Sequence, residues 1–250
     1  MPEKTAKKVR LDKLLFEKAI VESREKARAV ILEGNVLVNG MVVDKAGALV
    51  KPDAALSVKS KMPYVGRGGL KLEHAIEYFG IEIKGKTAMD VGASTGGFTD
   101  CLLQHGAKKV YAIDVGYGQF SWILRNNDKI VLLEKTNIRY LDKALIYDEI
   151  DIATIDVSFI SLLKVLPKVL EFLKPSGEIA ALIKPQFEAG RKDVGKGGVV
   201  RDEKKRLEII EKIKNESEKM GVEVKGITES PLKGPKGNVE YFIYLKKKQV

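Results

Sequence analysis

Two acidic residues, each closing a short apolar run, are the first residues whose types and spacing suggest chemistry. Asp90 follows Thr87-Ala-Met and opens a turn rich in Gly, Ser and Thr, and Asp114 follows Lys109-Val-Tyr-Ala-Ile. A strand, a glycine-rich turn and a helix begin many nucleotide-binding α/β domains, in which an acid closing the second strand can hydrogen-bond both ribose hydroxyls. The pair therefore predicts a cofactor that contains adenosine.

The spacing inside the turn narrows the choice of cofactor. The turn reads Asp90-Val-Gly-Ala-Ser-Thr-Gly-Gly-Phe-Thr99, without the G-x-G-x-x-G of dinucleotide sites or the Gly-Lys-Ser/Thr of a Walker loop. A carboxylate at the head of the turn would repel phosphates but suits a cationic ligand with an amino-acid end. We therefore expect S-adenosylmethionine. The predicted cofactor-binding residues are Asp90, Gly92, Ala93, Ser94, Thr95, Gly96, Gly97, Phe98, Asp114, Val115, Asn137, Ile138 and Asp156.

The elements that must hold these residues form one α/β domain. Strands are predicted at 87–90, 109–114, 130–134, 151–156, 178–184, 222–229 and 239–246, and helices at 71–79, 162–173 and 202–220. The last two strands are joined only by residues 230–238, which is too short for a parallel crossover, so the last strand should run antiparallel. Ligands of such sheets bind at the carboxyl ends of the strands, where Asp90, Asp114, Asp156 and Lys184 are expected.

The front of the chain has a different composition. Residues 1–67 hold 14 Lys and Arg against 8 Asp and Glu, out of a net charge of +10 for the whole chain. Helices are predicted from Val9 onward and over 24–33, capped by Ser23, followed by an Asn39-Gly40 hairpin and a strand over 55–59. The basic excess favours a polyanionic partner, nucleic acid and not a membrane.

This front segment resembles the αL RNA-binding motif of a small-subunit ribosomal protein, pseudouridine synthases and tyrosyl-tRNA synthetases. The resemblance lies in Arg10-Leu-Asp12, Ser23-Arg24-x-x-Ala27 and the run from Ile31 to Gly40. It implies RNA binding by basic residues, against the simpler alternative of a solvated helix face. The predicted RNA-binding residues are Arg10, Lys13, Arg24, Lys26, Arg28 and, in the following Pro/Gly-rich joint, Arg67.

Length and composition set the remaining limits. The 250 residues are divided into a domain over 1–60, a linker over 61–69 and a second domain over 70–250. The sequence has no apolar run of about 18 residues and no apolar signal-peptide core, so we expect a soluble, cytoplasmic protein. Cys101 is the only cysteine and His74 and His105 are the only histidines, so no His/Cys metal cluster is expected.

The second domain resembles the seven-stranded S-adenosylmethionine methyltransferases. Asp156-Val-Ser-Phe stands where base amino-group methylating enzymes carry Asp/Asn-Pro-Pro-aromatic, whereas Lys71, Asp156, Lys184 and Glu240 match the Lys-Asp-Lys-Glu pattern of FtsJ-like ribose 2'-O-methyltransferases. With Lys184-Pro-Gln-Phe-Glu188 and the front module, the chain resembles the TlyA-type ribosomal RNA 2'-O-methyltransferases, often labelled haemolysins.

This resemblance implies an α/β fold, a Rossmann-like seven-stranded methyltransferase sheet with its last strand antiparallel, preceded by a small N-terminal α+β RNA-binding domain. It also implies ribosomal RNA or ribosomal subunits as partners, no membrane and no metal, and catalysis by Lys71, Asp156, Lys184 and Glu240, with Lys184 as base or as a cation stabilising the alkoxide. Two alternatives remain: a membrane-active haemolysin, and a module that binds RNA and cofactor without turnover.

Overall fold

A computed structural model describes residues 8–32, 34–58, 63–190, 194–195 and 197–248. The chain divides into two compact units, Met1–Met62 and Pro63–Val250. Some predicted positions lie outside the described residues: Glu33 at the end of a predicted helix, Lys59 at the end of a predicted strand, and residues 61–62 of the predicted linker.

The first unit packs two helices on two small sheets. Its elements are β1 (Val9–Arg10), α1 (Leu11–Glu17), α2 (Arg24–Leu32), β2 (Val36–Val38), β3 (Met41–Val42), β4 (Leu49–Val50) and β5 (Leu56–Val58). The strands pair as β1-β4 and as β3-β2-β5. Leucines of α1 and the apolar face of α2 fill the core, which includes Leu11, Leu15 and Ile31 at 0% exposure.

Local signals predicted most of this unit correctly. The backbone N–H of Lys26 donates to Ser23 Oγ (3.1 Å), the expected cap of α2, and Asn39 and Gly40 both have positive φ, as the hairpin requires. The prediction of helix from Val9 was wrong at its start. Val9 and Arg10 form β1, which pairs with Val50 and Leu49, because that pairing depends on a partner 40 residues away.

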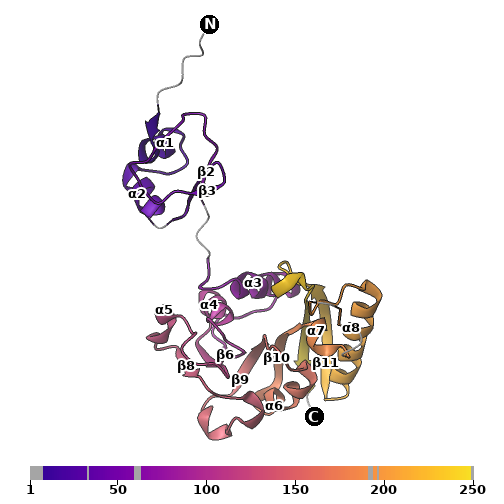
Figure 1. Ribbon diagram of the computed structural model, residues 1–250. Helices are drawn as coiled ribbons and strands as arrows, with labels where there is room; N and C mark the ends of the chain where they lie inside the picture. Colours follow the sequence, from indigo (N-terminus) through magenta and orange to yellow (C-terminus); the bar gives the residue numbers. More distant parts are fainter. Residues whose placement is uncertain (1–7, 33, 59–62, 191–193, 196, 249–250) are drawn as a thin grey trace. The chain divides into compact units, whose positions relative to one another are not determined.

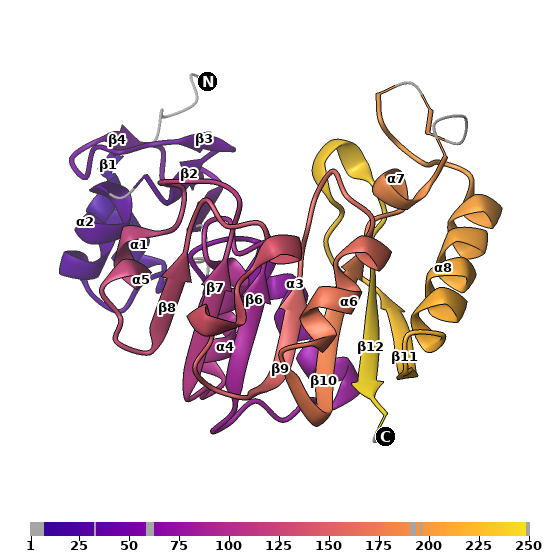
Figure 2. The same cartoon turned by 90° about the horizontal axis from the view of Figure 1, so that it is seen from below.

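The second unit is built on a seven-stranded sheet in the order β11-β12-β10-β9-β6-β7-β8 (Figures 1 and 2). Its strands are β6 (Thr87–Val91), β7 (Lys109–Ile113), β8 (Ile130–Leu133), β9 (Ile150–Ile155), β10 (Leu173–Ile183), β11 (Val222–Glu229) and β12 (Tyr241–Lys247). Strands β6 to β10 are parallel, and β12 runs antiparallel to both β10 and β11. The predicted fold and its antiparallel last strand are confirmed.

Helices cover both faces of this sheet. They are α3 (Gly68–Phe79), α4 (Gly97–Gln104), α5 (Trp122–Arg125), α6 (Leu166–Leu170), α7 (Pro185–Glu188) and α8 (Glu203–Glu218). Successive residues of a strand point to opposite faces. Accordingly Ala88 packs in one core with residues of α3 and α4, whereas Met89 packs in another with residues of α6 and α8. Burial on both faces explains why the central strands are almost wholly apolar.

The predicted helix over 162–173 was wrong in its extent. The structure has a 3₁₀ turn, η3 (Leu162–Lys164), then α6, after which the chain enters β10 at Leu173. Pro167 explains the break: a proline has no N–H to donate and is tolerated only in the first turn of a helix, which is where it lies in α6.

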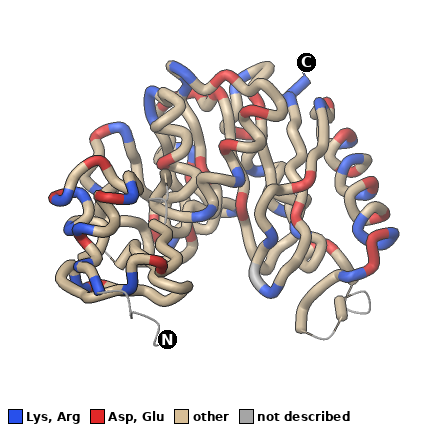
Figure 3. Tube along the Cα trace, turned by 90° about the horizontal axis from the view of Figure 1, so that it is seen from above, with Lys and Arg blue, Asp and Glu red and all other residues tan. Residues whose placement is uncertain are grey.

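Helix α8 shows how the surface of this unit manages its charge. Figure 3 shows Lys and Arg interspersed with Asp and Glu along α8. Two i,i+3 ion pairs lie within the helix, and a third joins Glu216 to its C-cap residue Lys219. Exposed pairs of this kind contribute little stability, and the mixed signs give this helix no strong preference for a polyanion.

Candidate active site

The carboxyl ends of four neighbouring parallel strands meet at one edge of the sheet. Gly92 follows β6, Asp114 follows β7, Asp156 follows β9 and Lys184 follows β10. Asp90 lies one residue before the end of β6 and is fully buried. Four of the predicted site residues therefore lie at one edge of the sheet, and the fifth, Asp90, lies in the interior.

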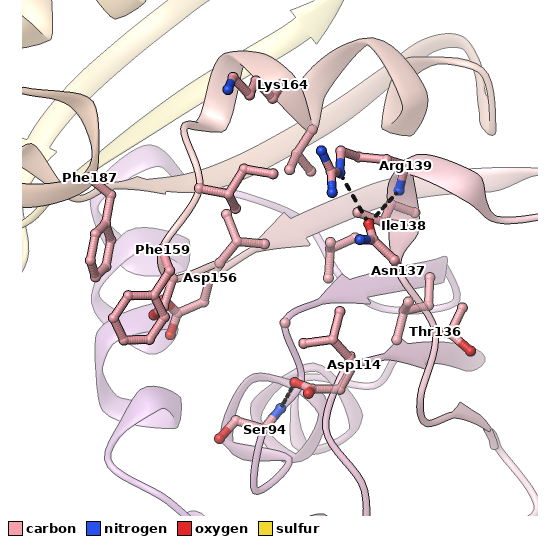
Figure 4. A pocket seen from close by; sticks show the side chains of 18 of the residues that line it. Ser94, Asp114, Thr136, Asn137, Ile138, Arg139, Asp156, Phe159, Lys164 and Phe187 are labelled. Carbon is pink, nitrogen blue, oxygen red and sulfur yellow. Dashed lines mark hydrogen bonds between the residues drawn. The ribbon is translucent and has the colours of Figure 1, made fainter.

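A pocket of about 780 Å³ opens at this edge (Figure 4). Of the predicted cofactor-binding residues, those that line it are Gly92, Ser94, Asp114, Val115, Asn137, Ile138 and Asp156. Figure 4 shows Phe159 and Phe187 beside Asp156 at one end of the pocket, and Asn137 with Arg139 towards the other.

Asp114 forms the polar wall of the pocket next to the glycine-rich loop. Its Oδ2 accepts the backbone N–H of Ser94 (2.7 Å), and its Oδ1 accepts the N–H of Gly116 (2.6 Å) and the amide of Gln119 (3.0 Å). A carboxylate offers about four acceptor positions. These donors orient Asp114 and leave it capacity to accept a hydroxyl of a ligand, as a ribose-binding acid must.

The glycines of the loop are required by packing within the protein. Gly92 has φ +89°, and a Cβ at this position would lie 2.5 Å from the carbonyl oxygen of Asp156. Gly96 has φ +92°, and its Cβ would lie 2.8 Å from Leu124 and 2.9 Å from Phe120. Backbone conformation and space thus exclude a side chain at both positions, and the absence of one at Gly92 lets the loop lie close to the end of β9.

The other predicted loop residues shape this loop and do not line the pocket. Ala93 packs with Phe120 and Leu124, and Phe98 stacks against Phe242 with ring centroids 6.1 Å apart. The residues in this group are Ala93, Thr95, Gly96, Gly97 and Phe98, together with Asp90.

Part of the predicted linker also packs against this loop. The backbone N–H of Val65 donates to Asp100 in α4 (2.8 Å), and the buried Tyr64 donates its hydroxyl to Glu73 in α3 (2.7 Å). A Cβ on Gly66 would lie 2.6 Å from Thr95 Oγ1. Residues 63–69 are therefore an ordered part of the second unit.

Asn137 and Ile138, two of the predicted cofactor-binding residues, lie after β8. The Asn137 side-chain oxygen accepts the backbone N–H of Arg139 (3.1 Å) and its Nε (3.3 Å), which caps the 3₁₀ turn η1 (Ile138–Tyr140). Because the oxygen is engaged, the side-chain amide N–H₂ of Asn137 is the group left for a ligand.

The four predicted catalytic residues form two ion pairs. Lys184 Nζ lies 2.5 Å from Asp156 Oδ1 and 3.0 Å from Ser158 Oγ. Lys71 Nζ lies 2.6 Å from Glu240 Oε2. Lys184 is not itself in the pocket lining, but Asp156 and Ser158 both are. The structure thus brings together a residue of α3 with residues at the ends of β9, β10 and β12.

The antiparallel last strand explains how Glu240 reaches this place. Ile183 of β10 pairs with Tyr241 of β12, so Lys184 and Glu240 are the next residues on the two strands. The amide of Gln186 also contacts Glu240 Oε1 (3.4 Å). A parallel last strand would start at the other edge of the sheet and would remove this carboxylate from the site.

Asp90 is a buried acid beneath the glycine-rich loop. Its carboxylate accepts the hydroxyls of Thr99 (2.6 Å) and Thr154 (3.3 Å). Burial, together with the nearby negative charge of Asp156, raises the pKa of Asp90 to about 7. Asp90 does not line the pocket, so its carboxylate is not positioned for the predicted contact with a cationic ligand. Its hydrogen bonds instead connect β6 to α4 and β9.

Sequence reasoning did not single out two aromatic residues of the site. Phe159 is 90% exposed and has φ +63°, and its ring lies 5.0 Å from that of Phe187. Glu188 accepts the backbone N–H of Leu162 (2.7 Å) and so joins the segment after β10 to the loop after β9. The available signal was an aromatic residue three positions after a predicted catalytic residue: Phe159 after Asp156 and Phe187 after Lys184.

The predicted RNA-binding residues differ in their surroundings. In the first unit, Arg10, Arg24 and Arg28 all contact Asp12. Lys13 pairs with Glu17 at 3.4 Å. Two further residues are exposed: Lys26 in α2, and Arg67 of the second unit, directly before α3.

The described residues contain no group of three or more His, Cys, Asp or Glu side chains arranged to hold a metal ion. Within the same residues, no helix is both long enough and apolar enough to span a membrane.

Comparisons with known proteins match both units. The FtsJ-like methyltransferase model matches residues 64–247, and the S4 domain model matches residues 9–56. The provisionally named rRNA methyltransferase YqxC of Bacillus subtilis is 46% identical over 243 residues, covering 96% of this chain and 86% of that protein. The 16S/23S rRNA (cytidine-2'-O)-methyltransferase TlyA of Mycobacterium tuberculosis is 41% identical, covering 96% of this chain and 91% of TlyA.

A solved structure provides the same assignment for the fold. A protein of Streptococcus thermophilus provisionally named a hemolysin has a TM-score of 0.75 at 40% identity, covering 97% of this chain and 89% of that one. The sheet, its antiparallel last strand and the edge pocket define a Rossmann-like methyltransferase carrying an N-terminal S4 domain. The chain belongs to the FtsJ-like methyltransferase family, and the predicted resemblance to TlyA-type proteins is confirmed.

Proposed function

We propose that this protein transfers a methyl group from S-adenosylmethionine to a ribose 2'-hydroxyl of ribosomal RNA. The observation that carries the proposal is the convergence of Lys71, Asp156, Lys184 and Glu240 from four separate elements, with Asp156 in the pocket wall. The ribosomal substrate and the ribose position rest on TlyA of Mycobacterium tuberculosis, whose name states both.

The pocket has the features that this cofactor needs. Asp114, oriented by three donors, would accept a ribose hydroxyl, and the N–H₂ group of Asn137 would face the adenine beside Ile138. Gly92 and Ser94 would bring backbone to the amino-acid end. When bound, the cofactor supplies an electrophilic methyl group on a sulfonium.

In this proposal Lys184 acts on the acceptor hydroxyl. A ribose hydroxyl is a very weak acid, so its proton must leave as the new bond forms. The amine of Lys184, held by Asp156 and Ser158, either removes that proton as a neutral base or stabilises the oxygen as a cation. The ion pair of Lys71 with Glu240, next to Lys184 through the pairing of β10 with β12, orients this amine.

The two units divide the work. Residues 1–60 bind RNA through Arg10, Lys13, Arg24, Lys26 and Arg28, and Arg67, within the predicted linker over 61–69, adds a basic contact. Residues 70–250 bind the cofactor and carry out the transfer in the cytoplasm. Loss of residues 1–60 should weaken RNA binding and leave cofactor binding unchanged, which filter binding and calorimetry on the truncated chain would measure.

The experiment that tests the proposal maps ribose methylation. Purified protein is incubated with ribosomal subunits and methyl-labelled S-adenosylmethionine, and the RNA is cleaved with alkali, which cannot cut after a 2'-O-methylated ribose. The wild-type chain should protect a defined nucleotide and Lys184→Ala should protect none. Lys174→Ala is the matched control, because Lys174 lies on the same strand at its opposite end, paired with Asp151.

Other outcomes would overturn the proposal in recognisable ways. Label in RNA without alkali resistance would mean that a base is methylated. Calorimetric binding of the cofactor and of RNA without transfer would indicate a module without turnover. Lysis of erythrocytes that persists in Lys184→Ala would indicate a membrane-active haemolysin.

A further inference from the structure

Three arginines of the first unit converge on one buried carboxylate, that of Asp12. Arg10 donates from Nε to Oδ1 (3.0 Å) and from Nη2 to Oδ2 (2.9 Å). Arg24 Nη2 and Arg28 Nε both donate to Oδ2, at 3.2 and 3.3 Å. The Asp12 side chain is 0% exposed, whereas the three arginine side chains are 43–53% exposed. The cations face solvent and the anion does not.

The cluster is not explained by the stability of α2, the helix that carries two of its three arginines. Arg24 lies in the first turn of α2, where the helix dipole disfavours a positive charge. Arg24 and Arg28 are i,i+4 neighbours, a spacing at which like charges destabilise a helix. Local preferences that are broken together often mark a functional site.

The guanidinium groups keep most of their donors for another ligand. An arginine has five N–H donors, and Arg24 and Arg28 each use one nitrogen on Asp12. Within the described part of the chain, none of the three is paired with a carboxylate other than Asp12. Glu25 also interacts electrostatically with Arg24 and Arg28. Three cations against these two anions still leave a local excess of positive charge, with the fork geometry that suits phosphate.

We propose that Asp12 is a positioning residue that pre-orders Arg10, Arg24 and Arg28 to receive backbone phosphates of RNA. The inference rests on the proposed RNA-binding function of this unit and deepens it. A free arginine loses rotamer freedom when it binds a phosphate. A side chain already held by Asp12 loses less, so the bound complex forms with higher affinity.

This role predicts a change opposite in sign to simple electrostatics. Removing a negative charge from a basic surface should strengthen RNA binding if charge alone matters. Removing Asp12 should instead weaken it, because three side chains become mobile. Glu17 provides the matched control, since it is an exposed carboxylate on the same helix paired with one cation, Lys13.

The experiment compares Asp12→Asn with Glu17→Gln in the full chain, by filter binding to purified ribosomal RNA across a range of salt concentrations. Asp12→Asn should weaken binding by roughly tenfold, and Glu17→Gln should leave it unchanged or strengthen it. The slope of log affinity against log salt concentration should stay at the wild-type value in Asp12→Asn, because no phosphate contact is removed. Each Arg→Ala variant should lower that slope by about 0.7 to 0.9.

Binding by Asp12→Asn at or above wild-type affinity would overturn the inference. If circular dichroism shows that this variant does not fold, the double variant Arg24→Lys, Arg28→Lys replaces it, since it keeps the charge but loses the fork. Wild-type affinity in that variant would equally overturn the inference. Unchanged affinity and slope in the Arg→Ala variants would instead refute RNA binding by this surface, which separates the two failures.

Discussion

The two ion pairs of the active site use the same chemical groups in different settings. The pair of Lys184 with Asp156 joins neighbouring strand ends, and the Asp156 side chain is 22% exposed and lines the pocket. The pair of Lys71 with Glu240 joins α3 to β12, and the Glu240 side chain is 0% exposed. The two lysine side chains are similarly enclosed, at 10% and 11% exposure, so the difference lies in the carboxylates: one lines the pocket and the other is buried.

This contrast predicts that the two ion pairs differ in how strongly they affect the rate of methyl transfer and the stability of the fold. Residues that contact the reacting atoms should affect the rate of transfer more than stability, and an enclosed ion pair should affect stability at least as much as rate. Measuring both quantities for both pairs tests whether the family pattern of four residues is one functional unit or two.

The largest effect is expected for Lys184→Ala. Loss of a positioned base or cation should lower single-turnover methyl transfer at saturating RNA and cofactor by about 10²–10⁴-fold. Lys71→Ala should lower it less. Lys184→Arg separates the two roles of the amine, because an arginine remains charged and can stabilise an oxyanion but cannot take a proton. Near-normal transfer by Lys184→Ala, with normal cofactor binding, would rule out both roles.

Glu240→Ala should have the next largest effect, on folding. It leaves the Lys71 ammonium, whose side chain is 11% exposed, without its carboxylate, and breaking a buried pair on one side costs about 3–5 kcal/mol. Urea denaturation should show this loss, and a much smaller one for Asp156→Ala. The double variant Lys71→Met, Glu240→Gln should recover part of the stability. Equal losses for Asp156→Ala and Glu240→Ala would remove the distinction between the pairs.

The buried Asp90 gives a pH-dependent test of the framework beside Asp156. The pKa of Asp90 is raised to about 7 in the folded chain, above that of an unfolded aspartate. Between these two pKa values Asp90 is protonated in the folded chain and ionised in the unfolded chain. Its stabilising contribution should be complete below about pH 4 and fall by roughly 3 kcal/mol as pH rises to about 7. Denaturation of wild type and Asp90→Asn without cofactor measures it. The stability difference between them should change over this range; a constant difference would show that Asp90 is ionised throughout.

The sequence predicted the sheet and its strand ends because both depend on local patterns. The apolar runs ended at Asp114, Asp156 and Lys184, and the short 230–238 connection implied the antiparallel last strand that carries Glu240. It did not predict which charges pair. Lys71 and Glu240 are 169 residues apart in the chain, and a family pattern names the residues without their partners.

The remaining differences have the same origin. The pairing of β1 with β4 and the cluster around Asp12 depend on contacts between distant segments. The burial of Asp90 depends on the helix that packs over it. For Asp12 and Asp90 the residue type alone did not identify the partner, because the three-dimensional neighbours decide which side chains each carboxylate contacts.

The smallest effect is expected at Glu188, which lies four residues after Lys184 and anchors the loop that follows Asp156. Glu188 accepts the N–H of Leu162, and burial raises its pKa. Lys184 at the other end of the same segment contacts Ser158, so the two segments are joined on both sides of Phe159. That residue holds a left-handed conformation, which costs about 1–3 kcal/mol and persists only where the surroundings impose it.

Glu188→Ala removes one support of this loop, and a lost backbone hydrogen bond is worth about 1 kcal/mol. Glu188→Gln keeps an acceptor for Leu162 and should restore most of what alanine loses. Because the loop forms the pocket wall beside Asp156, the loss should appear as a few-fold fall in single-turnover rate. The unfolding free energy of the second unit should fall by about 1 kcal/mol or less. Equal rates for Gln and Ala would show that the hydrogen bond does not position the loop. A loss for Gln as large as that for Lys184→Ala would mean that the carboxyl group itself takes part in transfer.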